Sequence, residues 1–179
     1  MVTTTATEPH TTDHDVLQTW ELVAQITDPE LPVITIEDLG ILRSVRVNGT
    51  DVTVQITPTY SGCPALEAIS DDVRRALTEA GFDHVTVDVV LAPAWTTDWI
   101  TEHGKDELRR FGIAPPSGRA TAGRATAARG GPVRMTLSVK CPQCDSLHTR
   151  ELSHFGSTSC KALYECLDCG EPFDYFKVL

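Results

Sequence analysis

The stretch TPTYSGCP, from Thr57 to Pro64, separates two segments with different hydrophobic periods. The segment before it alternates apolar and polar residues from Val52 onward, which predicts a strand with one buried face. The segment after it has apolar residues three or four positions apart from Leu66 to Leu77, which predicts an amphipathic helix. The chain therefore passes from a strand to a helix across a Ser-Gly-Cys-Pro turn.

Two interpretations of Cys63, in this turn, are open. Ser61 is a candidate N-cap and Pro64 suits the first helical turn, so the thiol would lie beside free backbone N–H groups at the positive end of a helix dipole. That environment holds the pKa of a thiol below its free value of about 8.5 and favours the thiolate, which binds metals and attacks electrophiles. The alternative is a small buried side chain, the usual role of a lone cysteine. The polar residues around Cys63 favour a functional role.

The segment before this strand predicts a helix, a loop and a hairpin. The helix begins at Asp13 or Asp15 and is ended by Pro29. Residues 28–32 contain two prolines and two carboxylates, so we expect an irregular loop there. A hairpin over residues 41–57 follows, with Asn-Gly as its type I′ turn because both central residues need a positive φ.

A third strand is predicted after the helix, over residues 85–91, by its alternating valines. A strand–helix–strand unit closes right-handed with its two strands parallel. Residues 14–93 are therefore expected to form an α+β domain with the order α-β-β-α-β and a small mixed three-stranded sheet.

Three other segments are distinguished by composition. Residues 1–13 are polar and threonine-rich, which predicts a disordered tail and not a secretory signal. Residues 94–114 hold two tryptophans and a helical pattern, which predicts a helical extension whose tryptophans more often pack in a core than face a partner. Residues 115–131 are rich in Ala, Gly and Arg, which predicts a flexible linker, so we expect no rigid bridge over residues 94–131.

The last module, residues 132–179, carries two Cys-x-x-Cys pairs 21 residues apart, Cys141 with Cys144 and Cys166 with Cys169. This is the pattern of a zinc ribbon, in which each pair turns two thiolates toward one tetrahedral metal. The module has few large apolar side chains, so the metal would supply much of its folding free energy. Rubredoxin-type iron also suits four thiolates, and two redox dithiols are a weaker alternative.

Cys160 is a further cysteine in this module, and three roles are open for it. It could be a spare ligand, a reactive thiol or a packed side chain, of which the last is the most common. His148 and His154 are expected to be surface residues, because four cysteines already complete the metal site.

The charge distribution limits the classes of partner. The net charge is −10, and residues 1–93 hold fifteen acidic residues against four basic ones. Phosphate neutralisation needs a basic face, so a nucleic-acid partner is not expected. No run of about 18 apolar residues is present, so no membrane span is expected and the cytoplasm is the expected compartment.

The chain resembles a known family at several of these motifs. Residues 28–32, 38–40 and 59–64 resemble the three signature loops of the metal–sulfur cluster biosynthetic (SufT-like) domain. The tail is similar to the D subunit, also called J, of the bacterial 1,2-phenylacetyl-CoA epoxidase system. The matching stretches outside the first domain are Thr96–Ile100, Arg109–Pro116, Phe155–Tyr164, Cys166–Cys169 and Glu171–Lys177.

The resemblance implies an accessory subunit in aerobic phenylacetate degradation. Diiron oxygenase chemistry would belong to other subunits, and this one would mature or insert a metal cofactor, above all the iron–sulfur cluster of the reductase subunit. Cys63 would bind iron or a cluster transiently, with Glu30 and Asp38 as candidate further ligands. The expected partners are the oxygenase and reductase subunits, and a homodimer mate could supply ligands too.

A non-enzymatic assembly factor is the favoured class, and two others stay open. The first is a cysteine-nucleophile enzyme that uses Cys63, which needs a nearby general base. His84 is the candidate base in the main domain, and it lies far from Cys63 in sequence. The second is a purely structural subunit that holds the oxygenase together.

Overall fold

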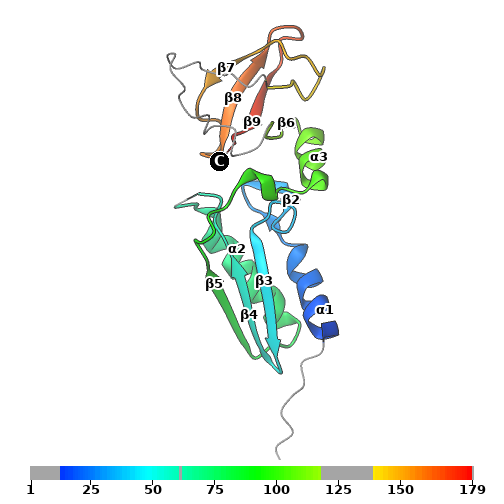
Figure 1. Ribbon diagram of the computed structural model, residues 1–179, viewed down its shortest axis with the longest axis vertical. Coiled ribbons are helices and arrows are strands. Elements are labelled where there is room, and N and C mark those ends of the chain that lie inside the picture. Colours follow the sequence, from blue (N-terminus) through cyan, green and yellow to red (C-terminus); the bar gives the residue numbers. More distant parts are fainter. Residues whose placement is uncertain (1–12, 61, 118–138, 179) are drawn as a thin grey trace, which may run out of the picture.

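The computed structural model describes residues 13–60, 62–117 and 139–178, and its first domain contains the predicted elements in the predicted order (Figure 1). The strands β3, β4 and β5 form one sheet in that order, with β3 antiparallel and β5 parallel to β4. The α+β fold with a mixed three-stranded sheet is thereby confirmed. The elements are α1 (Asp13–Ala24), β3 (Leu42–Asn48), β4 (Asp51–Ile56), α2 (Ala65–Glu79) and β5 (His84–Val89).

One face of this sheet is covered by the two helices. Helix α1 contacts β3, α2 contacts β5, and the helices contact each other. The buried apolar residues of α2 recur at every fourth position, at Ala65, Ile69, Val73 and Leu77, so they form one apolar stripe along the helix. Alternate residues of β4 are fully buried beneath it, which explains why the sequence periods located both elements.

The expectation of an irregular loop over residues 28–32 is wrong. Strands β1 (Thr27–Asp28) and β2 (Leu31–Thr35) form a two-stranded antiparallel sheet in which Asp28 pairs with Leu31. The Asp28 carboxylate accepts hydrogen bonds from the backbone N–H groups of Glu30 and Leu31, at 2.8 and 2.9 Å, and so closes the turn. Pro29 suits the second position of such a turn, and helix α1 ends earlier, at Ala24.

The type of the hairpin turn also differs from the prediction. Asn48 pairs with Asp51, so the central residues of the hairpin turn are Gly49, with a φ of 61°, and Thr50. Glycine at the first central position is typical of a type II′ turn, not the type I′ turn expected.

The start of α2 differs from the prediction as well. Pro64 takes the N-cap position, and no side chain caps it with a hydrogen bond. The predicted cap, Ser61, lies outside the described residues, as do most of the predicted tail and residues 118–138.

The extension after β5 has regular structure in its described part, and the expectation of no rigid bridge over residues 94–131 stays a prediction. It contains the short helix η1 (Thr97–Trp99), α3 (Glu102–Arg110) and the strand β6 (Ile113–Ala114). Trp95 is buried and its indole N–H donates to the Leu39 carbonyl at 3.0 Å, which confirms the core-packing role for this tryptophan. The predicted linker from residue 118 onward lies outside the described residues.

The C-terminal module forms a four-stranded sheet that includes one strand from the extension. Strands β7 (Thr149–Ser153), β8 (Lys161–Cys166) and β9 (Pro172–Phe176) pair in the order β6-β9-β8-β7, with β6 parallel to β9. Figure 1 shows this sheet beyond the end of the first sheet, with α3 and β6 beside the junction. The extension therefore joins both modules.

The two modules share a hydrophobic core at this junction. Phe176 of β9 is fully buried, and its ring centroid lies 6.2 Å from that of Trp95. Ile113 and Cys160 belong to the same buried cluster as the core of the first domain. Among the described residues, no helix is both long and apolar enough to cross a bilayer.

Candidate functional site

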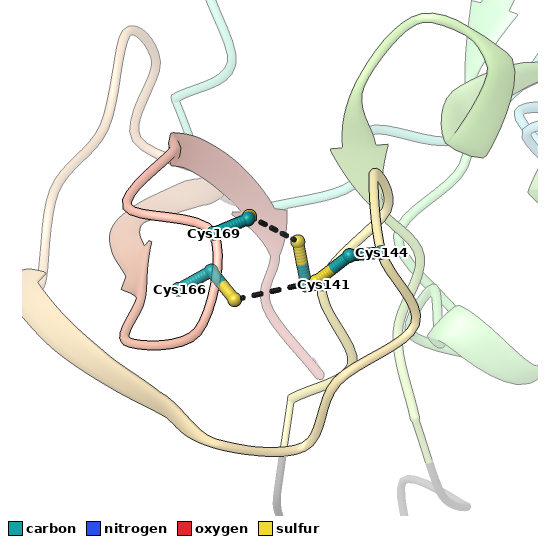
Figure 2. Close-up of side chains that lie close together, drawn as sticks. All are labelled: Cys141, Cys144, Cys166 and Cys169. Atoms are coloured by element: carbon teal, nitrogen blue, oxygen red, sulfur yellow. Dashed lines mark hydrogen bonds between the residues drawn. The ribbon is translucent and has the colours of Figure 1, made fainter.

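The two Cys-x-x-Cys pairs converge on one point in the C-terminal module (Figure 2). The four sulfur atoms of Cys141, Cys144, Cys166 and Cys169 all lie within 4.8 Å of one another. The Sγ atoms of Cys141 and Cys169 are 3.8 Å apart, and those of Cys144 and Cys166 are 3.5 Å apart. A metal bound tetrahedrally at about 2.3 Å from each sulfur requires sulfur separations of about 3.8 Å. The tetrad therefore fits a metal such as zinc.

Both pairs are held by the same local structure. The fourth residue after the first cysteine of each pair, Asp145 or Gly170, donates its N–H to the carbonyl of that cysteine, at 3.0 and 2.9 Å. Both have a positive φ, which turns each loop back on itself. The backbone N–H groups of Cys169 and Asp168 donate to the Cys166 thiol and lower its pKa to about 7. A thiol that loses its proton readily is suited to metal binding.

The histidines of this module are surface residues, as expected. His148 is exposed, and its Nδ1 lies 3.0 Å from Oδ1 of Asp168. This contact links the segment after the first cysteine pair to the loop of the second pair. His154 is also exposed and lies 3.4 Å from a Glu151 oxygen. Neither histidine belongs to the sulfur tetrad.

Cys63 lies in the turn before α2, and its pKa contradicts the prediction. Its thiol is partly buried and accepts a hydrogen bond from the Ala65 backbone N–H, as a helix start allows. Burial nevertheless raises the pKa of Cys63 above its ordinary value, and the charges of Glu30 and Asp28 raise it further. The sequence located the helix start, but it did not show that these carboxylates lie beside it.

Glu30 and Asp28, whose charges act on Cys63, lie at the turn between β1 and β2. Asp28 is buried, and burial raises its pKa; burial and the charge of Asp28 also raise the pKa of Glu30. Glu30 is among the residues expected near Cys63, whereas the sequence motif marks Asp28 only as a loop carboxylate. The hydrogen bonds of Asp28 with the turn backbone hold the turn that carries both carboxylates.

Asp38, the third residue expected at this site, is engaged elsewhere. Its carboxylate accepts hydrogen bonds from the hydroxyl groups of Thr35 and Thr101, and its Oδ2 lies 2.9 Å from His103 Nδ1. Thr101 in turn caps α3. The structure therefore joins Asp38 to the start of α3, where it holds the extension against the first domain.

Cys160, in the C-terminal module, belongs to the hydrophobic core against which Cys63 packs. It is buried, and its sulfur lies 2.9 Å from the Thr158 hydroxyl. Burial raises the pKa of this thiol as well, with added contributions from the charges of Glu30 and Asp28. The charges of Glu30 and Asp28 therefore act on the thiols of both Cys63 and Cys160. No sequence spacing relates residues so far apart in the chain.

Two family models match the two modules of this chain. Residues 18–89 match the model described as iron-sulfur cluster assembly protein. Residues 125–177 match the model described as PaaD zinc beta ribbon domain. The first match covers the three-stranded sheet, α2 and the second half of α1, and the second covers all four cysteines of the tetrad.

Individual proteins agree with these matches. The chain is 48% identical over 160 residues, 89% of its own length and 91% of the relative, to an Escherichia coli K12 protein named as the D subunit of 1,2-phenylacetyl-CoA epoxidase. It is 35% identical over 100 residues, 54% of its length and 90% of the relative, to the Fe-S protein maturation auxiliary factor of Porphyromonas gingivalis. A solved DUF59 domain from Bacillus anthracis aligns with 52% of this chain and 90% of its own, at 25% identity and a TM-score of 0.49. The chain therefore belongs to the D-type subunits of 1,2-phenylacetyl-CoA epoxidase, a family that joins an iron–sulfur cluster assembly domain to a zinc ribbon.

Proposed function

We propose that this protein is a non-enzymatic assembly factor of a phenylacetyl-CoA epoxidase system. It binds iron or an iron–sulfur cluster transiently at Cys63, with Glu30 as a further ligand, and passes this cargo to a partner subunit. The observation that carries the proposal is a partly buried thiol, Cys63, just before the start of α2 in the domain that matches the iron-sulfur cluster assembly model. The proposed client is the reductase subunit, whose iron–sulfur cluster needs assembly.

The side chains of Cys63 and Glu30 suit an iron-containing cargo. Thiolate sulfur is the usual ligand of iron–sulfur clusters, and carboxylate oxygen also binds iron. The carboxylates of Asp28 and Glu30 make the surroundings of Cys63 negative, which favours a bound cation. Cys63 and Glu30 cannot fill all the ligand positions of a cluster, so a client or a second copy of the chain must supply the rest. Such an incomplete ligand set favours release.

The alternative of a cysteine-nucleophile enzyme is disfavoured by the same geometry. The pKa of Cys63 is raised by burial, so the free thiol is not activated as a nucleophile. His84 pairs with Asp51 at the start of β4, whereas the Cys63 turn follows the opposite end of that strand. Five residue steps along a strand correspond to about 17 Å, too far for proton transfer between the two side chains.

For the sulfur tetrad we propose a structural zinc ion. Its four thiolates leave no open position, as is typical of structural rather than catalytic zinc. The matched domain is described as a zinc ribbon, which favours zinc over iron. When bound, zinc would fix the two cysteine loops and the sheet between them, because metal binding and folding are coupled in such modules.

Replacing Cys63 by serine in cells that make the whole epoxidase system tests the carrier function. We expect the oxygenase and reductase subunits at normal levels, but a purified reductase that has lost most of its iron–sulfur absorbance. Glu30→Gln should give a milder form of this defect. Glu79→Gln, at the exposed far end of α2, is the matched control and should leave the reductase unchanged. A fully matured reductase in the Cys63→Ser cells would instead favour a purely structural subunit.

A further inference from the structure

Strand β5 is an open edge of the first domain's sheet. Among the residues that the structure describes it pairs with β4 alone, and Figure 1 shows it at the outer side of that sheet. The Val90 N–H, just after β5, donates to the Ile56 carbonyl of β4 at 2.8 Å. Because the backbone groups of successive residues point to alternate sides of a strand, those of Val85, Val87 and Val89 point away from β4. They form a row of donors and acceptors to which a further strand can bind.

The side chains along this edge are apolar on the side of the sheet that the helices cover. Val85 and Val87 pack against the core but stay only half-buried, and Val89 is 47% exposed. The residues of β4 that pair with these three valines are all buried. A further strand beside β5 would therefore cover valine side chains that the chain itself leaves partly in water.

The opposite edge of the same sheet is protected against pairing, whereas β5 is not. Strand β3 has a register shift between Leu42 and Ser44, and it carries Arg43 and Arg46. Bulges and basic side chains are common protections of edge strands. Strand β5 keeps an unbroken register over its six residues and contains no proline, lysine or arginine.

The sequence of β5 is complementary to a second copy of itself. Residues 84–88 read His-Val-Thr-Val-Asp, which is symmetrical about Thr86 except for the exposed ends His84 and Asp88. An antiparallel pair of β5 strands centred on Thr86 places the two threonines opposite each other, Val85 opposite Val87, and His84 opposite Asp88. Thr–Thr pairs and pairs of opposite charge stabilise antiparallel strands. This register also sets the outward-pointing backbone groups of Val85 and Val87 in hydrogen-bonded positions.

We propose that the protein forms a symmetric homodimer through β5, with Thr86 on the two-fold axis. The two three-stranded sheets become one sheet of six strands, and the half-buried valines of each copy cover those of the other. The same surface serves both copies, as a two-fold interface requires. A second copy is the fitting occupant because each residue from 84 to 88 meets a favourable partner in this register.

The two Cys63 turns of such a dimer lie far apart. Each turn follows Ile56, whose partner on β5 is Val89, three residues beyond Thr86. In an antiparallel pair the two copies of Val89 lie on opposite sides of the axis, about 20 Å apart along the strands. Under the proposed carrier function, the second copy therefore adds no ligand to the cargo of the first, and the client supplies the missing ones.

Sedimentation equilibrium of the full-length, zinc-loaded protein over a range of concentrations tests this interface. We expect the wild type to reach twice the chain mass of 19.5 kDa. His84→Glu should weaken dimerisation about tenfold, because it places carboxylates opposite each other at two positions of the dimer. Adding Asp88→Lys to it should restore the dimer, because opposite charges then face each other again. Arg46→Glu, a charge reversal at an exposed position of β3, is the matched control and should leave dimerisation unchanged.

Val87→Pro tests the backbone pairing of the two copies. The Val87 N–H points away from β4, so proline there removes a hydrogen bond of the dimer and none of the chain's own sheet. We expect a monomer, and zinc content with circular dichroism reports whether the variant is folded. If it is not, the exchange of charges at His84 and Asp88 still decides, because both side chains are exposed.

Two results would overturn the β5 interface. One is a wild type that stays monomeric at every concentration, and the other is a dimer that His84→Glu and a folded Val87→Pro protein leave unchanged. Failure of the double charge variant to restore the dimer would overturn the register centred on Thr86. Iron measured in the same samples reports the carrier function separately, so a monomer that carries iron would leave that function standing.

Discussion

Replacing Cys166 by serine is expected to remove the metal from the ribbon and to unfold that module. Cys166 is fully buried and its sulfur lies 3.5 Å from that of Cys144, so a serine there leaves three thiolates around the metal. Structural zinc contributes apparent binding free energies of about 10–16 kcal/mol in zinc-finger peptides, and most of it would be lost. Bound zinc should fall from about one equivalent to nearly none.

Elemental analysis of the full-length protein, together with its near-ultraviolet circular dichroism, measures this effect. Cys63→Ser is the matched control, because it removes a cysteine outside the tetrad and should keep the full equivalent of zinc. Retention of one zinc and of the aromatic signal by Cys166→Ser would contradict a tetrad whose folding depends on all four thiolates.

The second large effect is expected for Phe176→Ala at the junction of the modules. Phe176 is fully buried beside Trp95, and removing a buried phenylalanine side chain costs about 3–5 kcal/mol of unfolding free energy. The same change should loosen the Cys160 loop, because the Lys177 N–H that follows Phe176 holds the Cys160 carbonyl.

Denaturant unfolding gives this free energy, and a fixed, saturating zinc concentration keeps the contribution of zinc binding to stability the same in all variants. Phe155→Ala is the control, since that ring is 64% exposed and its removal should cost less than about 1 kcal/mol. A Phe176→Ala protein as stable as the control would show that the ribbon does not pack on the first domain.

Local patterns were sufficient to predict the three-stranded sheet, its two helices and the sulfur tetrad. The alternating apolar residues of β4 and the apolar residues at every fourth position of α2 located a strand and a helix. The right-handed closure of a strand–helix–strand unit then predicted that β5 lies parallel to β4. The spacing of the four cysteines likewise predicted the tetrad before its geometry was known. In each case the signal lies within one element or one short loop.

What could not be predicted depends on contacts between distant segments. The two prolines near Asp28 suggested a loop, but the side chain of Asp28 closes a hairpin by bonding the turn backbone. The pKa of Cys63 was expected to lie below its ordinary value because the sequence around it predicts the start of a helix. The carboxylates whose charges raise this pKa come from another turn of the chain. The burial of Cys160 in the shared core depends on how the ribbon packs on the first domain, where Phe176 lies beside Trp95.

The central claim is that the Cys63 turn carries iron, and metal analysis of protein purified anaerobically from iron-replete cells tests it most directly. Iron, zinc and acid-labile sulfide are measured in the wild type beside Cys63→Ser. The account predicts about one zinc in both proteins, and iron, with or without sulfide, in the wild type alone. Equal iron in the two proteins, or no iron in the wild type, would contradict it.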